Sequence, residues 1–135
     1  MINMASGINI LINDGGAPAR IMKLGLAAAD IDAGTFVGFV GGEISATGLG
    51  SIPAASNAVG VLFVDAVSGE PASVLTGSGL MCYLKSTGTI ATGANLSHNG
   101  DGLAVDTTNT TDECLAVALE AKGATHTGFT KVLLR

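Results

Sequence analysis

The chain has 135 residues and a net charge of −5, and only 13% of its residues are charged. This length fits a single domain, and the charged share is about half of what soluble domains usually carry. We expect partners to cover part of so thinly charged a surface; the alternative is an inert surface rich in alanine, glycine and threonine. Lys and Arg do not cluster and aromatic residues make up 4%. This excludes both a phosphate-binding stripe and a base-stacking platform, so no nucleic-acid partner is expected.

The beginning of the chain and its cysteines indicate where the protein is assembled. The first ten residues lack the basic start and long apolar run of a signal peptide. No apolar stretch approaches the roughly 20 residues of a membrane span, so no membrane partner is expected. Cys82 and Cys114 stand alone among apolar residues. We interpret them as reduced core thiols of a protein assembled in cytoplasm, with a bridge between them as the alternative.

The first predicted element is an extended segment over residues 1–13. Ile8, Ile10 and Ile12 alternate with other residues in the period-2 pattern of a strand. We predict either a free N-terminal arm, suited to adding a strand to another sheet, or the first strand of this domain's own sheet. Asn13-Asp14-Gly15-Gly16 then supplies the residues that a tight turn requires.

Short strands are predicted for the remainder of the chain, because glycines and small polar residues recur about every eight to twelve residues. Residues 20–29 favour helix by composition, but Gly25 interrupts them and the apolar residues form no helical stripe, so we predict a strand. Val40-Gly41-Gly42-Glu43 reads as a hairpin turn between strands 35–39 and 43–47, and Asn99-Gly100-Asp101-Gly102 as a second tight turn. Further strands are predicted at residues 58–64, 74–76, 80–84, 114–119 and 130–134.

A weak internal repeat runs through the sequence. Residues 31–34 resemble residues 90–93, residues 59–63 resemble 115–119, and residues 74–75 resemble 132–133. The pairs lie roughly 58 residues apart, so the repeat predicts two similar β units near residues 30–80 and 88–135. The alternative is chance similarity within a chain rich in alanine, glycine and valine.

No pattern of catalytic or metal-binding residues is apparent. His98 and His126 lie in glycine- and threonine-rich sequence without other ligands at zinc spacing, which predicts solvated loop histidines. Asp30 and Asp32 are interpreted as turn formers, because neighbours in sequence seldom face each other across a substrate. Neither a nucleophile elbow nor a phosphate-binding loop occurs. We therefore predict no catalytic residue, no cofactor and no metal.

Four segments together resemble the carboxy-terminal half of phage capsid cement proteins, the head decoration family that includes lambda-type proteins. They are residues 89–98, 102–105, 114–121 and 129–134, with short apolar strands between turn glycines. Residues 30–34 and 57–61 resemble the same pattern again, so the resemblance extends from about Arg20 onward. The long polar loop 106–112, and Ala116 where glycine is commoner, depart from the pattern.

The short strands and turn glycines predict an all-β fold, with residues 14–135 as a single β domain. The resemblance implies that this domain is a small β-sandwich or a tulip-like barrel. It also implies a non-enzymatic virion protein that is assembled in the host cytoplasm and binds the capsid exterior. There it would bridge subunits of the major capsid protein, as a homotrimer. By analogy with the lambda-type arm, the residues expected to contact the capsid are Ile2, Asn3, Ile8, Ile10 and Ile12.

Two other functions remain open from the sequence. One is a different virion β-module, such as a head-fibre or carbohydrate-binding domain. Sugar rings usually stack on Trp or Tyr, and this chain offers only Tyr83. The other is a small β-barrel enzyme.

Overall fold

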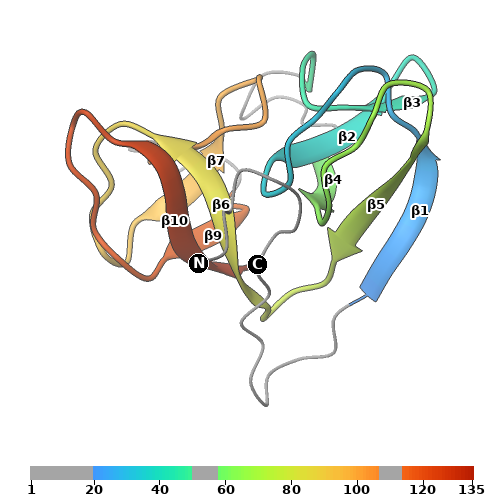
Figure 1. Ribbon diagram of the computed structural model, residues 1–135. Coiled ribbons are helices and arrows are strands. Elements are labelled where there is room, and N and C mark those ends of the chain that lie inside the picture. The colour runs from blue at the N-terminus through green and yellow to red at the C-terminus, as the bar shows by residue number, and fades with distance from the viewer. Residues whose placement is uncertain (1–19, 50–57, 107–113) are drawn as a thin grey trace, which may run out of the picture.

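The computed structural model describes residues 20–49, 58–106 and 114–135 (Figure 1). Within these residues the fold is all-β without any helix, as predicted. The predicted segment 1–13 and its turn at residues 13–16 lie outside the described residues. The strands are β1 (Arg20–Leu26), β2 (Phe36–Val40), β3 (Glu43–Ser45), β4 (Ala58–Leu62), β5 (Pro71–Thr76), β6 (Met81–Thr87), β7 (Asn95–His98), β8 (Ala104–Asp106), β9 (Ala116–Ala118) and β10 (Thr127–Leu134).

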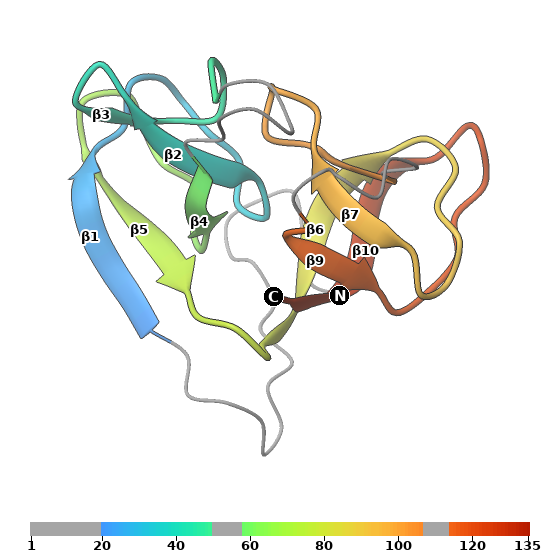
Figure 2. The same cartoon turned by 180° about the vertical axis from the view of Figure 1, so that it is seen from behind.

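The strands form two five-stranded units packed together (Figures 1 and 2). Unit 1 contains β1 to β5 in the order β1-β5-β4-β2-β3. Unit 2 is a closed barrel in the order β10-β6-β8-β7-β9. When the barrel is followed from β6 through β10, the strand order is β6-β10-β9-β7-β8. This matches the order β1-β5-β4-β2-β3 of unit 1 if each strand of unit 1 corresponds to the strand five places later in the chain. The predicted repeat is therefore confirmed at the level of topology.

The two units also share their register. Three residue pairs of unit 1 recur in unit 2: Val61↔Leu75 as Val117↔Leu133, Phe36↔Val61 as Asn95↔Val117, and the parallel pair Ala27↔Ile44 as Ser86↔Ala104. In unit 2 the parallel pair joins β6 to β8 and closes the barrel, whereas in unit 1 it is an isolated bridge at Ala27, just after β1. Because strand order and register both agree, the sequence similarity reflects a structural repeat rather than shared composition.

Glycines form the tight turns where the sequence predicted them. In the β2–β3 hairpin, Val40 pairs with Glu43, and Gly41 and Gly42 between them have φ of 61° and 83°. The turn between β7 and β8 has Gly100 at 90° and Gly102 at 82°. These values lie in the left-handed region that side chains with a Cβ atom disfavour, so glycine is required there.

Not every strand was predicted. The segment 20–29 does form a strand, β1, with a bulge between Lys23 and Gly25. β7 and β8 were not predicted as strands, because they are short and β7 has the polar sequence Asn-Leu-Ser-His. Their formation depends on pairing with each other and with β6 and β9, which no local pattern reveals.

The hydrophobic core has two parts. One cluster fills unit 1 and includes Val37, Ile44, Leu62 and Val74. The larger cluster fills the barrel of unit 2 and extends into the junction between the units, where Phe36, Leu49, Val61 and Leu75 of unit 1 join it. The two units are therefore held together by continuous apolar packing.

Candidate functional site

A cleft of about 290 Å³ lies where the two units meet. Its walls come from β4, from the end of β5 and the turn after it, and from the ends of unit 2. The lining residues are Phe36, Ala58, Val59, Gly60, Val61, Leu75, Thr76, Gly77, Ser78, Leu115, Leu134 and Arg135. Arg135 supplies the charge in a lining that is otherwise apolar or neutral, so these residues offer no acid–base pair. The cleft offers a small bound group both apolar packing and polar contacts.

A buried polar cluster lies inside the barrel of unit 2. Ser86 Oγ is 3.0 Å from His126 Nε2 and 2.5 Å from Thr130 Oγ1, and it donates to the Gly128 carbonyl oxygen at 3.3 Å. The first distance is within the range of a nucleophile and its base. However, Ser86 is only 2% exposed and Thr130 is fully buried. A substrate has no access to this hydroxyl, so the cluster satisfies buried polar groups instead.

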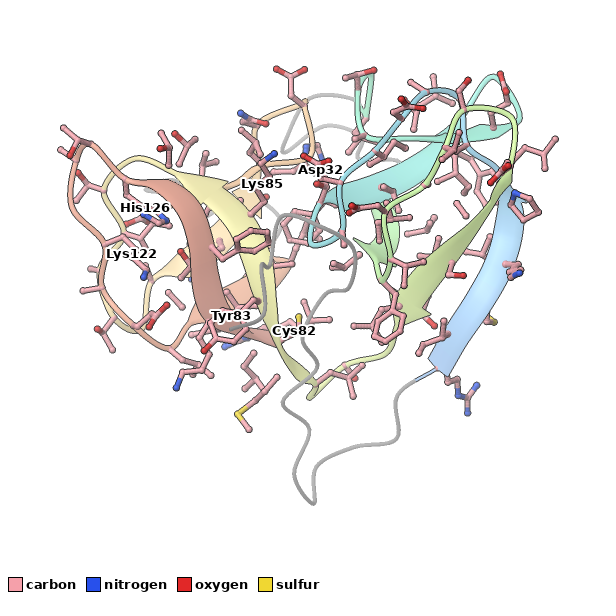
Figure 3. All side chains as sticks on the ribbon, viewed as in Figure 1. Asp32, Cys82, Tyr83, Lys85, Lys122 and His126 are labelled. Atoms are coloured by element: carbon pink, nitrogen blue, oxygen red, sulfur yellow. The ribbon has the colours of Figure 1, made fainter. Side chains whose placement is uncertain are left out.

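Both histidines are more enclosed than the sequence predicted. His126, labelled in Figure 3, is half-buried. Its Nε2 lies 3.0 Å from Ser86 Oγ and 3.4 Å from Thr130 Oγ1. His98 is 5% exposed, its Nδ1 accepts a hydrogen bond from the Gly100 N–H at 3.0 Å, and its ring lies 6.4 Å from that of Phe36. The prediction of solvated loop histidines was therefore wrong, because each ring contacts residues distant in sequence or closes a turn.

The acidic residues near the start of β2 have structural partners. Asp30 Oδ1 accepts a hydrogen bond from the N–H of Ser68 at 2.9 Å, a residue 38 positions away, so this side chain joins two distant loops and does not form a turn as predicted. Asp32 instead pairs with Lys85 of unit 2, with Oδ2 2.7 Å from Nζ (Figure 3). Both side chains of this pair are substantially exposed, so its contribution to stability is small. It nevertheless marks the contact between the units.

The side chains of Cys82 and Glu120 have shifted pKa values. Burial in the core raises the pKa of the Cys82 thiol to about 12. The backbone N–H of Lys131, 3.0 Å from Glu120 Oε1, lowers the pKa of that carboxyl, and Lys122 at 3.1 Å adds to the shift. Both cysteines are free; Cys82 is a core thiol as predicted, whereas Cys114 is only half-buried.

Among the described residues, no His, Cys, Asp or Glu side chains gather in a group of three that could hold a metal. The same residues contain no helix long and apolar enough to cross a membrane.

The predicted capsid-contact residues Ile2, Asn3, Ile8, Ile10 and Ile12 lie outside the described residues. The described surface has exposed apolar side chains that sequence reasoning did not single out: Ile21, Met22, Leu26, Phe39, Val59 and Val67. Three of them belong to β1, which pairs with β5 along one edge. The sequence contains no signal that β1 lies at the edge of its sheet, because this depends on which strands pair.

The described fold belongs to the class of small all-β proteins built from two repeated five-stranded units. Among solved structures, the chain is similar to the N base of head fiber gp8.5 of bacteriophage phi29. The two are 18% identical, with a TM-score of 0.58 over 87% of this chain and 93% of that chain. No family model and no curated protein matches the sequence.

Proposed function

We propose that this protein is a non-enzymatic structural component of a phage virion. It binds the exterior of the head and stabilises the shell by bridging subunits of the major capsid protein. The observation that carries this proposal is the likeness of fold to the base of a phage head fiber over nearly the whole of both chains. The resemblance of residues 89–134 to cement proteins supports the same location.

The surface of the described residues suits such a role. Charges are few, and apolar side chains such as Ile21 and Met22 of β1 are exposed. A protein that binds only the assembled shell shifts the equilibrium toward that shell by mass action, and this requires no chemistry. The buried Ser86 hydroxyl fits a protein without catalytic activity.

A second candidate is a part of a head fibre, and the likeness to the phi29 fiber base supports it equally. The two roles differ in their effect on the shell. A cement protein, which bridges subunits, should raise the temperature at which capsids disrupt, whereas a fibre base that bridges no subunits should leave it nearly unchanged. Thermal disruption of capsids with and without the protein, together with images of both kinds of particle, separates them. A carbohydrate-binding module is disfavoured because Tyr83 is half-buried in β6.

For attachment, we propose that the alternating isoleucines near the N-terminus add a strand to a sheet edge of the capsid. Deleting residues 2–11 should weaken binding to expanded capsids by tenfold or more, a loss of at least ~1.4 kcal/mol. Ile10→Asp should act in the same direction and leave the thermal unfolding of the isolated protein unchanged. Val67→Asp, at an exposed turn, is the control variant. Binding as tight as that of the full chain would place the contact elsewhere, and a truncated chain that fails to fold would make the segment an internal strand.

The protein is proposed to assemble in the host cytoplasm and to form a homotrimer on the capsid. Images of decorated capsids test this directly, since isolated copies that do not touch one another would contradict it.

A further inference from the structure

The contact between the two units joins different surfaces of the repeat. Each unit has two such surfaces, which we call its tail surface and its head surface. The tail surface consists of the loop that leads into the second strand of the unit and the first residue of that strand. The head surface combines the end of the first strand with the turn between the second and third strands. In the junction, the tail surface of unit 1 (Asp32, Gly34 and Phe36) meets the head surface of unit 2 (Lys85, His98 and Gly102).

Two backbone hydrogen bonds and one ion pair define this contact. The Lys85 N–H donates to the Gly34 carbonyl oxygen at 2.7 Å, and the Phe36 N–H donates to the Gly102 carbonyl oxygen at 2.9 Å. Asp32 Oδ2 lies 2.7 Å from Lys85 Nζ. The approach is close: a Cβ atom on Gly102 would lie 2.6 Å from the Phe36 carbonyl oxygen, and one on Gly34 would lie 2.7 Å from the Phe129 ring.

The repeat register places a second tail surface on unit 2 and a second head surface on unit 1. The second tail surface is Ala91, Gly93 and Asn95, and the second head surface is Leu26, Phe39 and Gly42. The local conformation agrees between the units. Gly34 and Gly93 both have φ of 84°, and their N–H groups donate to equivalent carbonyls, Leu62 and Ala118, at 2.8 Å each. Gly42 and Gly102 have φ of 83° and 82°.

Both second surfaces are open within the described part of the chain. A Cβ atom on Gly42 or Gly93 would meet nothing within 4 Å, in contrast to Gly102 and Gly34. Phe39 is 41% exposed. His98, which occupies the equivalent position of unit 2, is 5% exposed because unit 1 packs on it.

The first strands of the two units also differ in exposure, because β6 closes a barrel around its core whereas β1 lies at the edge of a sheet. Met22 is 42% exposed, whereas its equivalent in β6, Cys82, is completely buried. Leu26 is 49% exposed at the position that corresponds to Lys85. The Lys85 side chain itself keeps 39% of its surface exposed, so the clearest effect of the internal contact is the burial of His98 relative to Phe39.

The two open surfaces lie at opposite ends of the molecule. β3 and the end of β1 lie at one side, and the segment between β6 and β7 lies at the other, in both views (Figures 1 and 2). A single copy cannot bring them together. A second copy of this chain presents the matching surface to each of them.

We propose that copies of this protein dock head to tail, with the tail surface of unit 2 on the head surface of unit 1 in the next copy. This inference rests on the self-association proposed above and names the surfaces that carry it. In this contact the Leu26 N–H of one copy donates to the Gly93 carbonyl oxygen of the next copy. The Asn95 N–H of that next copy donates to the Gly42 carbonyl oxygen of the first copy. Such a heterologous contact closes into a ring, for example of three copies, or continues as an open chain.

The side chains at the proposed contact are compatible with each other. Where the internal contact has Lys85 against Asp32, the contact between copies has Leu26 against Ala91. Both members of the ion pair are thus replaced by apolar residues. This replacement leaves no unpaired charge between the copies, and it explains why Leu26 is exposed on a strand of a single copy.

The test transfers the internal ion pair to the contact between copies. Leu26→Lys and Ala91→Asp each introduce the residue that the other unit carries at that position, so both variants are expected to fold. Each single change leaves one charge opposite an apolar residue and should lower the association constant at least tenfold in sedimentation equilibrium. The double variant should regain association, and its association should weaken with added salt, unlike that of the wild type. Val59→Lys, in the cleft between the units, is the control and should associate as the wild type does.

Two results would overturn the inference. One is a wild-type chain that stays monomeric up to about 1 mM, a concentration that detects contacts of only ~4 kcal/mol. The other is association that Leu26→Lys leaves unchanged. These measurements need no capsids, so they fail or succeed independently of capsid binding. A protein that associates head to tail but does not bind capsids would contradict the proposed function and leave this contact intact.

Discussion

Replacing Gly102 with alanine tests the packing of the two units, because the repeat offers a matched control at Gly42. The two glycines occupy equivalent turns with φ of 82° and 83°. Alanine at either position adopts a left-handed conformation, which costs about 1–2 kcal/mol. At Gly42 this is the whole effect, since the added methyl group meets nothing within 4 Å.

At Gly102 the added methyl group also clashes with unit 1. It would lie 2.6 Å from the Phe36 carbonyl oxygen and 3.1 Å from Ala46 Cβ, and it also meets Thr35. Backbone atoms cannot rotate away, so overpacking adds about 1–3 kcal/mol. We expect Gly102→Ala to lower the free energy of unfolding by about 2–5 kcal/mol, against about 1–2 kcal/mol for Gly42→Ala.

The assay is urea unfolding of both variants and the wild type, followed by circular dichroism in dilute solution so that association does not contribute. The reasoning predicts a lower midpoint for Gly102→Ala than for Gly42→Ala. Equal losses would mean that the Gly102 turn does not pack against unit 1, and the described contact between the units would be wrong.

Three further outcomes follow from the described side chains. Cys82 should resist a thiol reagent in the native protein while Cys114 reacts. Because burial raises the pKa of Cys82 in the folded protein to about 12, the buried neutral thiol contributes fully to the free energy of unfolding below about pH 8.5, and this contribution declines as the pH rises from there. Glu120→Gln should reduce the free energy of unfolding by up to ~1 kcal/mol at neutral pH. Because the pKa of Glu120 is lowered in the folded protein, the difference in unfolding free energy between this variant and the wild type should shrink below about pH 4.3. A difference that stays constant in acid would contradict this reasoning. Ser86→Ala should cost about 1–3 kcal/mol in thermal unfolding because Thr130 loses a buried partner, and Ser86→Ala with Thr130→Ala should cost less than the sum of the two single changes.

The sequence alone predicted the parts of this protein that depend on neighbours along the chain. The Gly41-Gly42 and Gly100–Gly102 turns were recognisable because left-handed backbone conformations select glycine. Most strands were recognisable from short apolar runs between turn residues. The repeat was also visible, since residues 59–63 and 115–119 keep the same pattern, and this predicted two units of equal topology.

The tertiary structure decided everything that depends on distant partners. Asp32 meets Lys85, and Ser86 meets His126, across more than 30 residues in each case. The same local pattern gives an exposed Phe39 in unit 1, whereas its counterpart His98 is buried in unit 2. Burial depends on which surface of one unit packs on the other, and local propensity along a chain contains no information about that packing.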